Sequence, residues 1–96
     1  MQAPPHFIRN NEEWIIWLLE GEFSGSATPW DLSSRTGIPL DAIHDNFLYM
    51  ERVGLLSIDR DPAKRYPEEI ARVNLTKNSR KICDELKIRP DPGDLF

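Results

Sequence analysis

The stretch GIPLDAIHDNFLYMERVGLL, residues 37–56, decides how this chain folds. Ile43, Phe47 and Met50 recur within it at intervals of four and three residues, which is the spacing of one helix face. One glycine precedes this run and another follows it, at points where a left-handed backbone can stop a helix. The pattern therefore predicts a helix over residues 39–53 whose apolar face packs inward.

The opposite face of this helix should combine carboxylates with apolar side chains. With His44 exposed on the flank, helical geometry places five residues outward: Asp41, Asp45, Leu48, Tyr49 and Arg52. Asp41 would lie in the first turn, where a carboxylate gains about 0.3–1 kcal/mol from the helix dipole. Asp45 lies in mid-helix and fits three roles: a solvated residue, an acceptor for a cytosine amino group, or a contact to a basic protein.

Two helices are predicted before this one. The first begins at Asn10 or Asn11, ends at Gly21 and carries an apolar stripe made of Trp14, Ile15, Leu18 and Leu19. Residues 22–27 are expected to form a loop. The motif TPWD, residues 28–31, then supplies a capping box and a proline at the first helical position, so it should start a short helix over residues 29–36.

Two strands and a last helix should follow. Apolar residues alternate in LLSIDR, residues 55–60, and IARVNLT, residues 70–76, should place Ala71, Val73 and Leu75 on one face. The charged loop between them, residues 61–69, is broken by two prolines. Thr76 can cap a helix over about residues 77–87 that buries Ile82 and Leu86.

This order of elements predicts a winged helix-turn-helix, a mainly α (α+β) fold. Three helices form a small core, a two-stranded β-hairpin covers its open side as the wing, and a C-terminal helix follows. We expect an N-terminal arm at residues 1–9, one domain at residues 10–88 and a tail at residues 89–96. The length of 96 residues suits a single domain with one modest core.

The charge is unevenly distributed along the chain. The formal net charge is −4, which is not the general signature of a nucleic-acid-binding protein. Residues 1–48 hold two basic and seven acidic side chains, whereas residues 52–81 hold eight basic and four acidic ones. A basic segment therefore follows an acidic one, and it predicts a local surface that could face phosphates.

Several classes of function have no support in the sequence. The single Cys83 excludes an internal disulfide, fits a helix residue near the core and indicates a reducing cytoplasm. The apolar run WIIWLL, residues 14–19, is far shorter than the roughly 20 residues that cross a bilayer, so no membrane association is expected. No metal-ligand spacing, catalytic triad or phosphate-binding glycine loop occurs, so we predict a protein that is not an enzyme and uses no metal or cofactor.

Two segments resemble winged-helix transcriptional regulators of the MarR and IclR types. TGIPLDAIHDNFLYMERVGLL, residues 36–56, is similar to their turn and recognition helix. RDPAKRYPEEIARVNLTKNSRKICDEL, residues 60–86, is similar to the MarR-type wing and the helix after it. The resemblance covers roughly residues 12–87 and implies a transcriptional regulator of prokaryotic or phage type that binds double-stranded DNA.

In such regulators DNA contacts come from the recognition helix, the preceding helix and the wing. The resemblance places these contacts on Ser33, Ser34, Arg35, Asp41, Ala42, His44, Asp45, Tyr49, Lys64 and Arg65. Arg60 on the flanking strand is a further candidate. Asp41, Ala42 and Asp45 depart from the Ser, Thr or Arg usual in these families.

The alternative is a winged helix that binds a protein, as an adaptor or an inhibitor. The acidic recognition helix would then face a basic partner. Ile16 and Trp17 should point away from the core, where either the N-terminal arm covers them or they form a homodimer through the first helix. The candidate protein contacts are Ile16, Trp17, Trp30, Asp41, Asp45 and Leu48.

Overall fold

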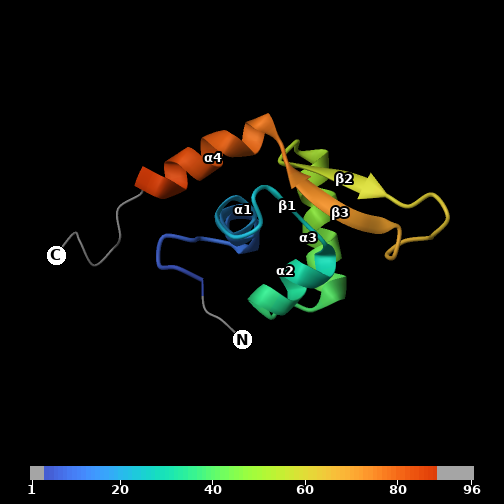
Figure 1. Cartoon of the computed structure of the whole chain (residues 1–96). Helices are drawn as coiled ribbons and strands as arrows, with labels where there is room; N and C mark the ends of the chain where they lie inside the picture. The colour runs from blue at the N-terminus through green and yellow to red at the C-terminus, as the bar shows by residue number, and fades with distance from the viewer. Residues whose placement is uncertain (1–3, 89–96) are drawn as a thin grey trace.

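The computed structural model describes residues 4–88 of the chain. Figure 1 shows α1 at the centre, α4 crossing beside it, and the hairpin of β2 and β3 extending away as a wing. The predicted winged helix-turn-helix is confirmed. The elements in chain order are α1 (Asn11–Gly21), β1 (Ser26–Ala27), α2 (Pro29–Thr36), α3 (Leu40–Arg52), β2 (Leu56–Arg60), β3 (Ile70–Leu75) and α4 (Lys77–Ile88).

Local signals set the ends of the first two helices. The Asn10 side chain caps α1 by accepting a hydrogen bond from the Glu13 backbone N–H at 2.9 Å. Thr28 and Asp31 form the predicted capping box of α2, with hydrogen bonds of 3.1 and 3.2 Å. Gly37 ends α2 with a φ of 79°, a left-handed conformation that costs a glycine little.

Helix α3 starts one residue later than predicted and has no side-chain cap. Its inward face matches the expected pattern, because Ile43, Phe47 and Met50 are all fully buried. Gly54 follows the helix with a φ of 82° and lets the chain turn directly into β2. The helix that the opening stretch predicted is therefore present over most of its expected length.

The sheet has three strands rather than the two expected. Its order is β1-β3-β2, with both pairs antiparallel. The loop expected at residues 22–27 contains β1, which pairs Ser26 with Asn74 and Ala27 with Val73. Two residues are too short to show alternation in the sequence, so only the pairing with β3 makes this strand recognisable.

The expected face of β3 was partly wrong because the strand contains a β-bulge. Arg72 pairs with Asp59 and Ile70 pairs with Arg60, which leaves Ala71 as the extra residue. Ile70 is consequently buried while Ala71 is exposed. The bulge reverses the alternation near the wing and turns Ala71 outward.

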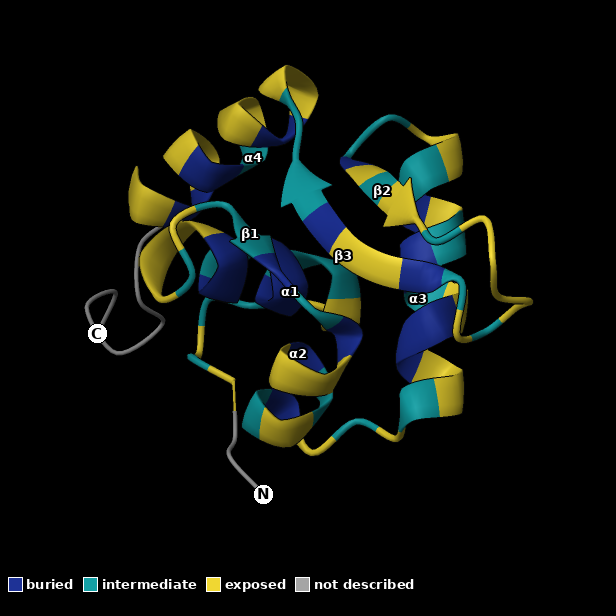
Figure 2. Cartoon of the chain, turned by 45° about the vertical axis from the view of Figure 1, so that its right-hand side comes forward, coloured by how far each residue is buried: buried dark blue, intermediate teal, exposed yellow. Residues whose placement is uncertain are grey.

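The core lies between α1, α2, α3 and the sheet, and Figure 2 shows the buried segments of these elements facing one another. In α4 the buried residues are Ser79, Cys83 and Leu86, whereas Ile82 is only half-buried. Helix α4 packs mainly against α1. The prediction that Cys83 lies in or near the core is confirmed, since it is 4% exposed.

The described part of the N-terminal arm lies against α1. The Phe7 and Trp17 rings meet edge to face with centroids 4.8 Å apart, and Ile8 packs against the core. The expectation that Ile16 points away from the core is wrong, because its side chain is 1% exposed. The expected tail, residues 89–96, lies outside the described residues.

Candidate nucleic-acid interface

The outward face of α3 carries the charges expected from the sequence. Asp41, Ala42, Asp45, Tyr49 and Arg52 are all exposed. The Arg52 guanidinium lies 5.8 Å from the centre of the Tyr49 ring, within the range of a cation–π contact. The face therefore offers two carboxylates in its first half and an arginine with a tyrosine in its second half.

His44 does not lie where the sequence placed it. Its side chain is 7% exposed, not on a solvated flank. The imidazole meets Phe47 and Tyr66 edge to face, at centroid distances of 6.4 and 6.1 Å. Because the loop that carries Tyr66 folds over α3, the flank of the helix becomes an interior position, and His44 is a poor candidate for a direct DNA contact.

The His44 Nδ1 atom is buried and has no hydrogen-bond partner among the described residues. Buried side-chain polar atoms usually have a hydrogen-bond partner, because leaving such an atom without one costs about 1–3 kcal/mol. This orphaned atom therefore marks a place where a further hydrogen-bonding group would be stabilising.

Tyr66, in the loop of the wing, contacts two side chains of α3. Its hydroxyl donates a hydrogen bond of 3.4 Å to the Asp45 carboxylate, and its ring covers His44. Desolvation, with a further contribution from the nearby Asp45 charge, raises the pKa of Tyr66 above its ordinary value. Asp45 is thus exposed and still has a specific partner. The sequence did not predict the contact between Asp45 and Tyr66.

Two basic side chains at the wing tip have no acidic partner within residues 4–88. Lys64 and Arg65 are exposed and belong to none of the ion pairs of that range. Backbone hydrogen bonds shape the loop around them, since Lys64 N–H donates to the Asp61 carbonyl and Glu69 N–H donates to the Arg65 carbonyl. The fold therefore presents these two cations on a turn beside α3.

Two other predicted DNA contacts are already engaged in ion pairs. The Arg60 guanidinium binds both oxygens of Glu51, at 2.6 and 2.8 Å, and this hydrogen bonding lowers the pKa of Glu51. The Arg35 guanidinium binds Glu22 in the same way, with the shorter nitrogen–oxygen pair at 2.5 Å. Neither arginine offers its full charge to a phosphate, and their partners Glu22 and Glu51 were missed because they lie nine or more residues away in the chain.

The remaining candidates on α2 and α3 have different environments. Ser34 is exposed, whereas Ser33 is half-buried and donates a 2.6 Å hydrogen bond to the Ile38 carbonyl in the turn. Trp30 is 66% exposed at the start of α2. Leu48 is half-buried and packs against the core, so the expectation that it points outward is wrong.

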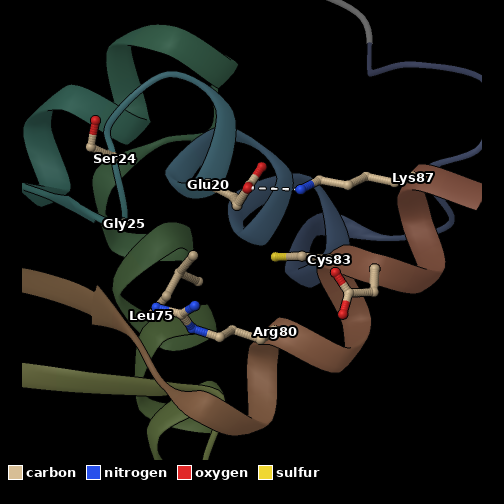
Figure 3. Close-up of a pocket in the computed structure, with 8 residues that line it drawn as sticks. Glu20, Ser24, Gly25, Leu75, Arg80, Cys83 and Lys87 are labelled. Atoms are coloured by element: carbon tan, nitrogen blue, oxygen red, sulfur yellow. Dashed lines mark hydrogen bonds and ion pairs between the residues drawn. The ribbon is translucent and has the colours of Figure 1, made fainter.

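A separate polar cavity of about 500 Å³ lies between α4 and the end of α1 (Figure 3). The Glu20 carboxylate and the Lys87 ammonium form an ion pair of 3.0 Å there. Burial raises the pKa of the neighbouring Cys83 thiol, which makes it a poor nucleophile at neutral pH. The arrangement is that of a structural cysteine.

The described residues contain no group of His, Cys, Asp and Glu side chains that could hold a metal ion. In the same range, none of the helices is both long and apolar enough to cross a membrane.

Fold and surface together define a winged helix-turn-helix protein, and solved structures of MarR-type regulators share this fold. The adhesin competence repressor AdcR from Streptococcus pyogenes is 20% identical over 83% of this chain, with a TM-score of 0.65. A MarR mutant from E. coli, complexed with operator DNA, is 16% identical over 82% of the chain, also with a TM-score of 0.65. A transcriptional regulator from Thermotoga maritima is 20% identical over 85%, with a TM-score of 0.67.

These structures are longer than the present chain. The matched region covers 55%, 53% and 54% of the three proteins, so the chain spans little more than half of their length. No protein-family model and no curated protein sequence matches the chain. At these identities the likeness establishes the shared fold, and the activity has to be argued from the surface.

Proposed function

We propose that this protein binds double-stranded DNA as a small transcriptional regulator, with α3 in the major groove and the wing on the phosphate backbone. The observation that carries the proposal is the pair of unpaired cations, Lys64 and Arg65, on a structured loop beside α3. The operator-bound MarR structure with the same fold supports it. We also propose that the protein is located in the cytoplasm.

The charges of α3 define how such a complex would work. Asp41 and Asp45 repel phosphates, so they belong over base edges, where a carboxylate can accept a hydrogen bond from a cytosine amino group. Arg52 and Tyr49 lie further along the same face and could reach the backbone. Non-specific affinity should therefore be modest and should depend strongly on the wing.

The first test measures binding to random-sequence duplex DNA at a series of salt concentrations. The fluorescence anisotropy of the labelled DNA reports the binding. We expect micromolar binding at low salt with log affinity falling as log salt rises. Lys64→Ala combined with Arg65→Ala should weaken binding to all sequences and reduce the magnitude of the salt slope by about two.

Arg80→Ala combined with Lys81→Ala is the matched control, since it removes two exposed cations of α4. This control should leave the slope nearly unchanged. Equal losses in the two double variants would mean that binding follows net charge and not the wing. Absence of binding by the unmodified protein at low salt would overturn the proposal.

A second candidate function is binding of a basic protein through the acidic start of α3. The exposed carboxylates of Asp41 and Asp45 favour it, because they face solvent on the surface that would otherwise read DNA. Asp45→Ala should then abolish capture of the partner, whereas the Lys64→Ala, Arg65→Ala double variant should retain it. The opposite pattern supports DNA.

The surroundings of Ile16 and Trp17 do not favour the homodimer interface expected through the first helix. Ile16 is buried and the Phe7 ring lies against Trp17, so the arm already covers this part of α1. Sedimentation velocity of the full chain tests whether a homodimer forms.

A further inference from the structure

The polar side chains in the first half of α3 differ in what already binds them. Asp41 Oδ1 accepts a hydrogen bond of 2.9 Å from the Ala42 backbone N–H, in the first turn of the helix. The helix dipole stabilises a carboxylate at this place, so the fold alone accounts for Asp41. The Asn46 amide donates a hydrogen bond of 3.2 Å to the Ala42 carbonyl. Both side chains are therefore bound to the backbone of α3 itself, whereas Asp45 is not.

Asp45 is held from outside its own helix. The Tyr66 hydroxyl donates a long hydrogen bond of 3.4 Å to Asp45 Oδ1, and the Tyr66 ring packs against His44 with ring centroids 6.1 Å apart. The second carboxylate oxygen, Asp45 Oδ2, accepts no hydrogen bond within residues 4–88, and the residue is exposed. The wing thus orients this carboxylate through one oxygen and leaves the other oxygen free for a ligand.

A free carboxylate oxygen distinguishes the four bases, because it accepts hydrogen bonds and donates none. In the major groove guanine presents N7 and O6 and thymine presents O4, and these acceptors repel a carboxylate. The amino groups of cytosine N4 and adenine N6 donate, but adenine also carries the acceptor N7 beside its amino group. Cytosine is therefore the base that best matches a single free carboxylate oxygen.

We propose that Asp45 selects a cytosine in the DNA site of this protein, and that Tyr66 is the positioning residue that directs the Asp45 carboxylate toward the base. This inference rests on the proposed binding of DNA by α3 and the wing, and it adds the base that is read and the pair of residues that reads it. Because Tyr66 belongs to the loop of the wing, the base preference depends on the wing as well as on α3.

The first experiment selects bound duplexes from a pool of random sequence at low salt and sequences them. We expect enrichment of cytosine at one fixed position, preferred about five- to tenfold over guanine and thymine, at the lower end for a base contact because one oxygen is used. Recovery of DNA without this preference overturns the present inference alone. Recovery of no DNA above the level found without protein overturns it together with the proposed function, so the two failures are distinguishable.

Asp45→Asn tests the identity of the reading group. It should change the preference at that position from cytosine to adenine, because an asparagine amide pairs with adenine N6 and N7. Asp84→Asn is the matched control, since it removes the same charge from an exposed aspartate of α4. The control should keep the cytosine preference, and any general gain in affinity from lost negative charge should appear in both variants. A cytosine preference that persists in Asp45→Asn would overturn the inference.

Tyr66→Phe tests the positioning role, because it keeps the aromatic ring beside His44 and removes the hydroxyl. The preference for the cytosine duplex over its guanine counterpart should fall about two- to fivefold, which is the usual cost of ordering one side chain on binding. The ratio of the two affinities is the readout, since a structural loss of the wing would lower both affinities by the same factor. An unchanged ratio would overturn the role of Tyr66.

A change in the DNA assigns the contact to atoms. Replacing the selected cytosine with 2-pyrimidinone removes the N4 amino group and keeps the ring. The replacement should weaken binding of the unmodified protein and have little effect on Asp45→Ala, as expected when two groups interact directly. Equal losses in the two proteins would mean that Asp45 and the amino group do not meet, which would overturn the inference.

Discussion

Tyr66 joins the wing to α3 with one side chain. Its hydroxyl bonds to Asp45, and its ring covers His44, a residue that would otherwise be solvated. The contact uses a carboxylate on the surface proposed to read DNA, so the orientation of Asp45 depends on the position of the wing. A single residue thus couples the two parts of the proposed interface.

The first residue-scale prediction concerns the Tyr66 hydroxyl. Spectrophotometric titration of Tyr49→Phe, which leaves Tyr66 as the sole tyrosine, should give a phenol pKa above the ordinary value of about 10. Because the pKa is raised in the folded state, the associated stability is present below about pH 10 and is lost as the pH rises through the raised value. Adding Asp45→Asn should lower the pKa toward the ordinary value; no change would mean that Asp45 has no influence.

A second residue-scale prediction concerns Cys83. Burial, the main cause, raises the pKa of its thiol, so the folded protein should react slowly with a disulfide reagent at pH 8 and rapidly in denaturant. The sign is the same as for Tyr66: stability falls only when the pH exceeds the ordinary thiol pKa. Rapid labelling of the folded chain would contradict the buried position of the side chain.

At the scale of elements, the joint between α3 and β2 controls the charge that the wing can offer. Glu51 on α3 holds the guanidinium of Arg60 on β2 with two hydrogen bonds. The ion pair fixes the strand beside the helix and at the same time neutralises an arginine near the proposed DNA. The sequence made Arg60 a candidate DNA contact because of its place on the strand that flanks the wing, and it gave no sign of this partner.

Glu51→Gln should therefore strengthen non-specific DNA binding. The change frees the Arg60 charge, so log affinity should depend more steeply on log salt, by up to about 0.9 for one added phosphate contact. Glu12→Gln, which removes a carboxylate from α1, is the control for net charge. If both variants strengthen binding equally, the local explanation is wrong. Anisotropy titrations at several salt concentrations give the measurement.

At the scale of the whole molecule, two arginine–glutamate pairs connect separate parts of the fold. Arg35 on α2 pairs with Glu22 after α1, and Arg60 pairs with Glu51. Hydrogen bonding to arginine lowers the pKa of both glutamates. All four side chains are partly exposed, so solvent screening keeps the energetic effect small.

Stability should consequently decline in acid. A lowered folded-state pKa contributes stability above the ordinary glutamate value of about 4.5 and loses it as the pH falls through the lowered value. Urea unfolding between pH 6 and pH 3 should show a shallower decline for Glu22→Gln combined with Glu51→Gln than for the unmodified chain. Parallel declines would mean that these pairs do not carry the acid dependence.

The sequence by itself determined the helices and their ends. Asn10, Thr28 and Gly54 act through bonds and backbone angles within a few residues, and the face of Ile43, Phe47 and Met50 follows from helical spacing alone. Such signals are complete within one or two turns of chain. Together with the alternation of apolar residues over 55–60 and 70–76, they predict a winged helix-turn-helix.

Only the tertiary structure decided what lies around α3. The strands β2 and β3 pair with a bulge at Ala71, and the loop between them places Tyr66 against Asp45, 21 residues away, and beside the buried His44. These features depend on where separate elements pack, and no periodicity within one element records the position of another.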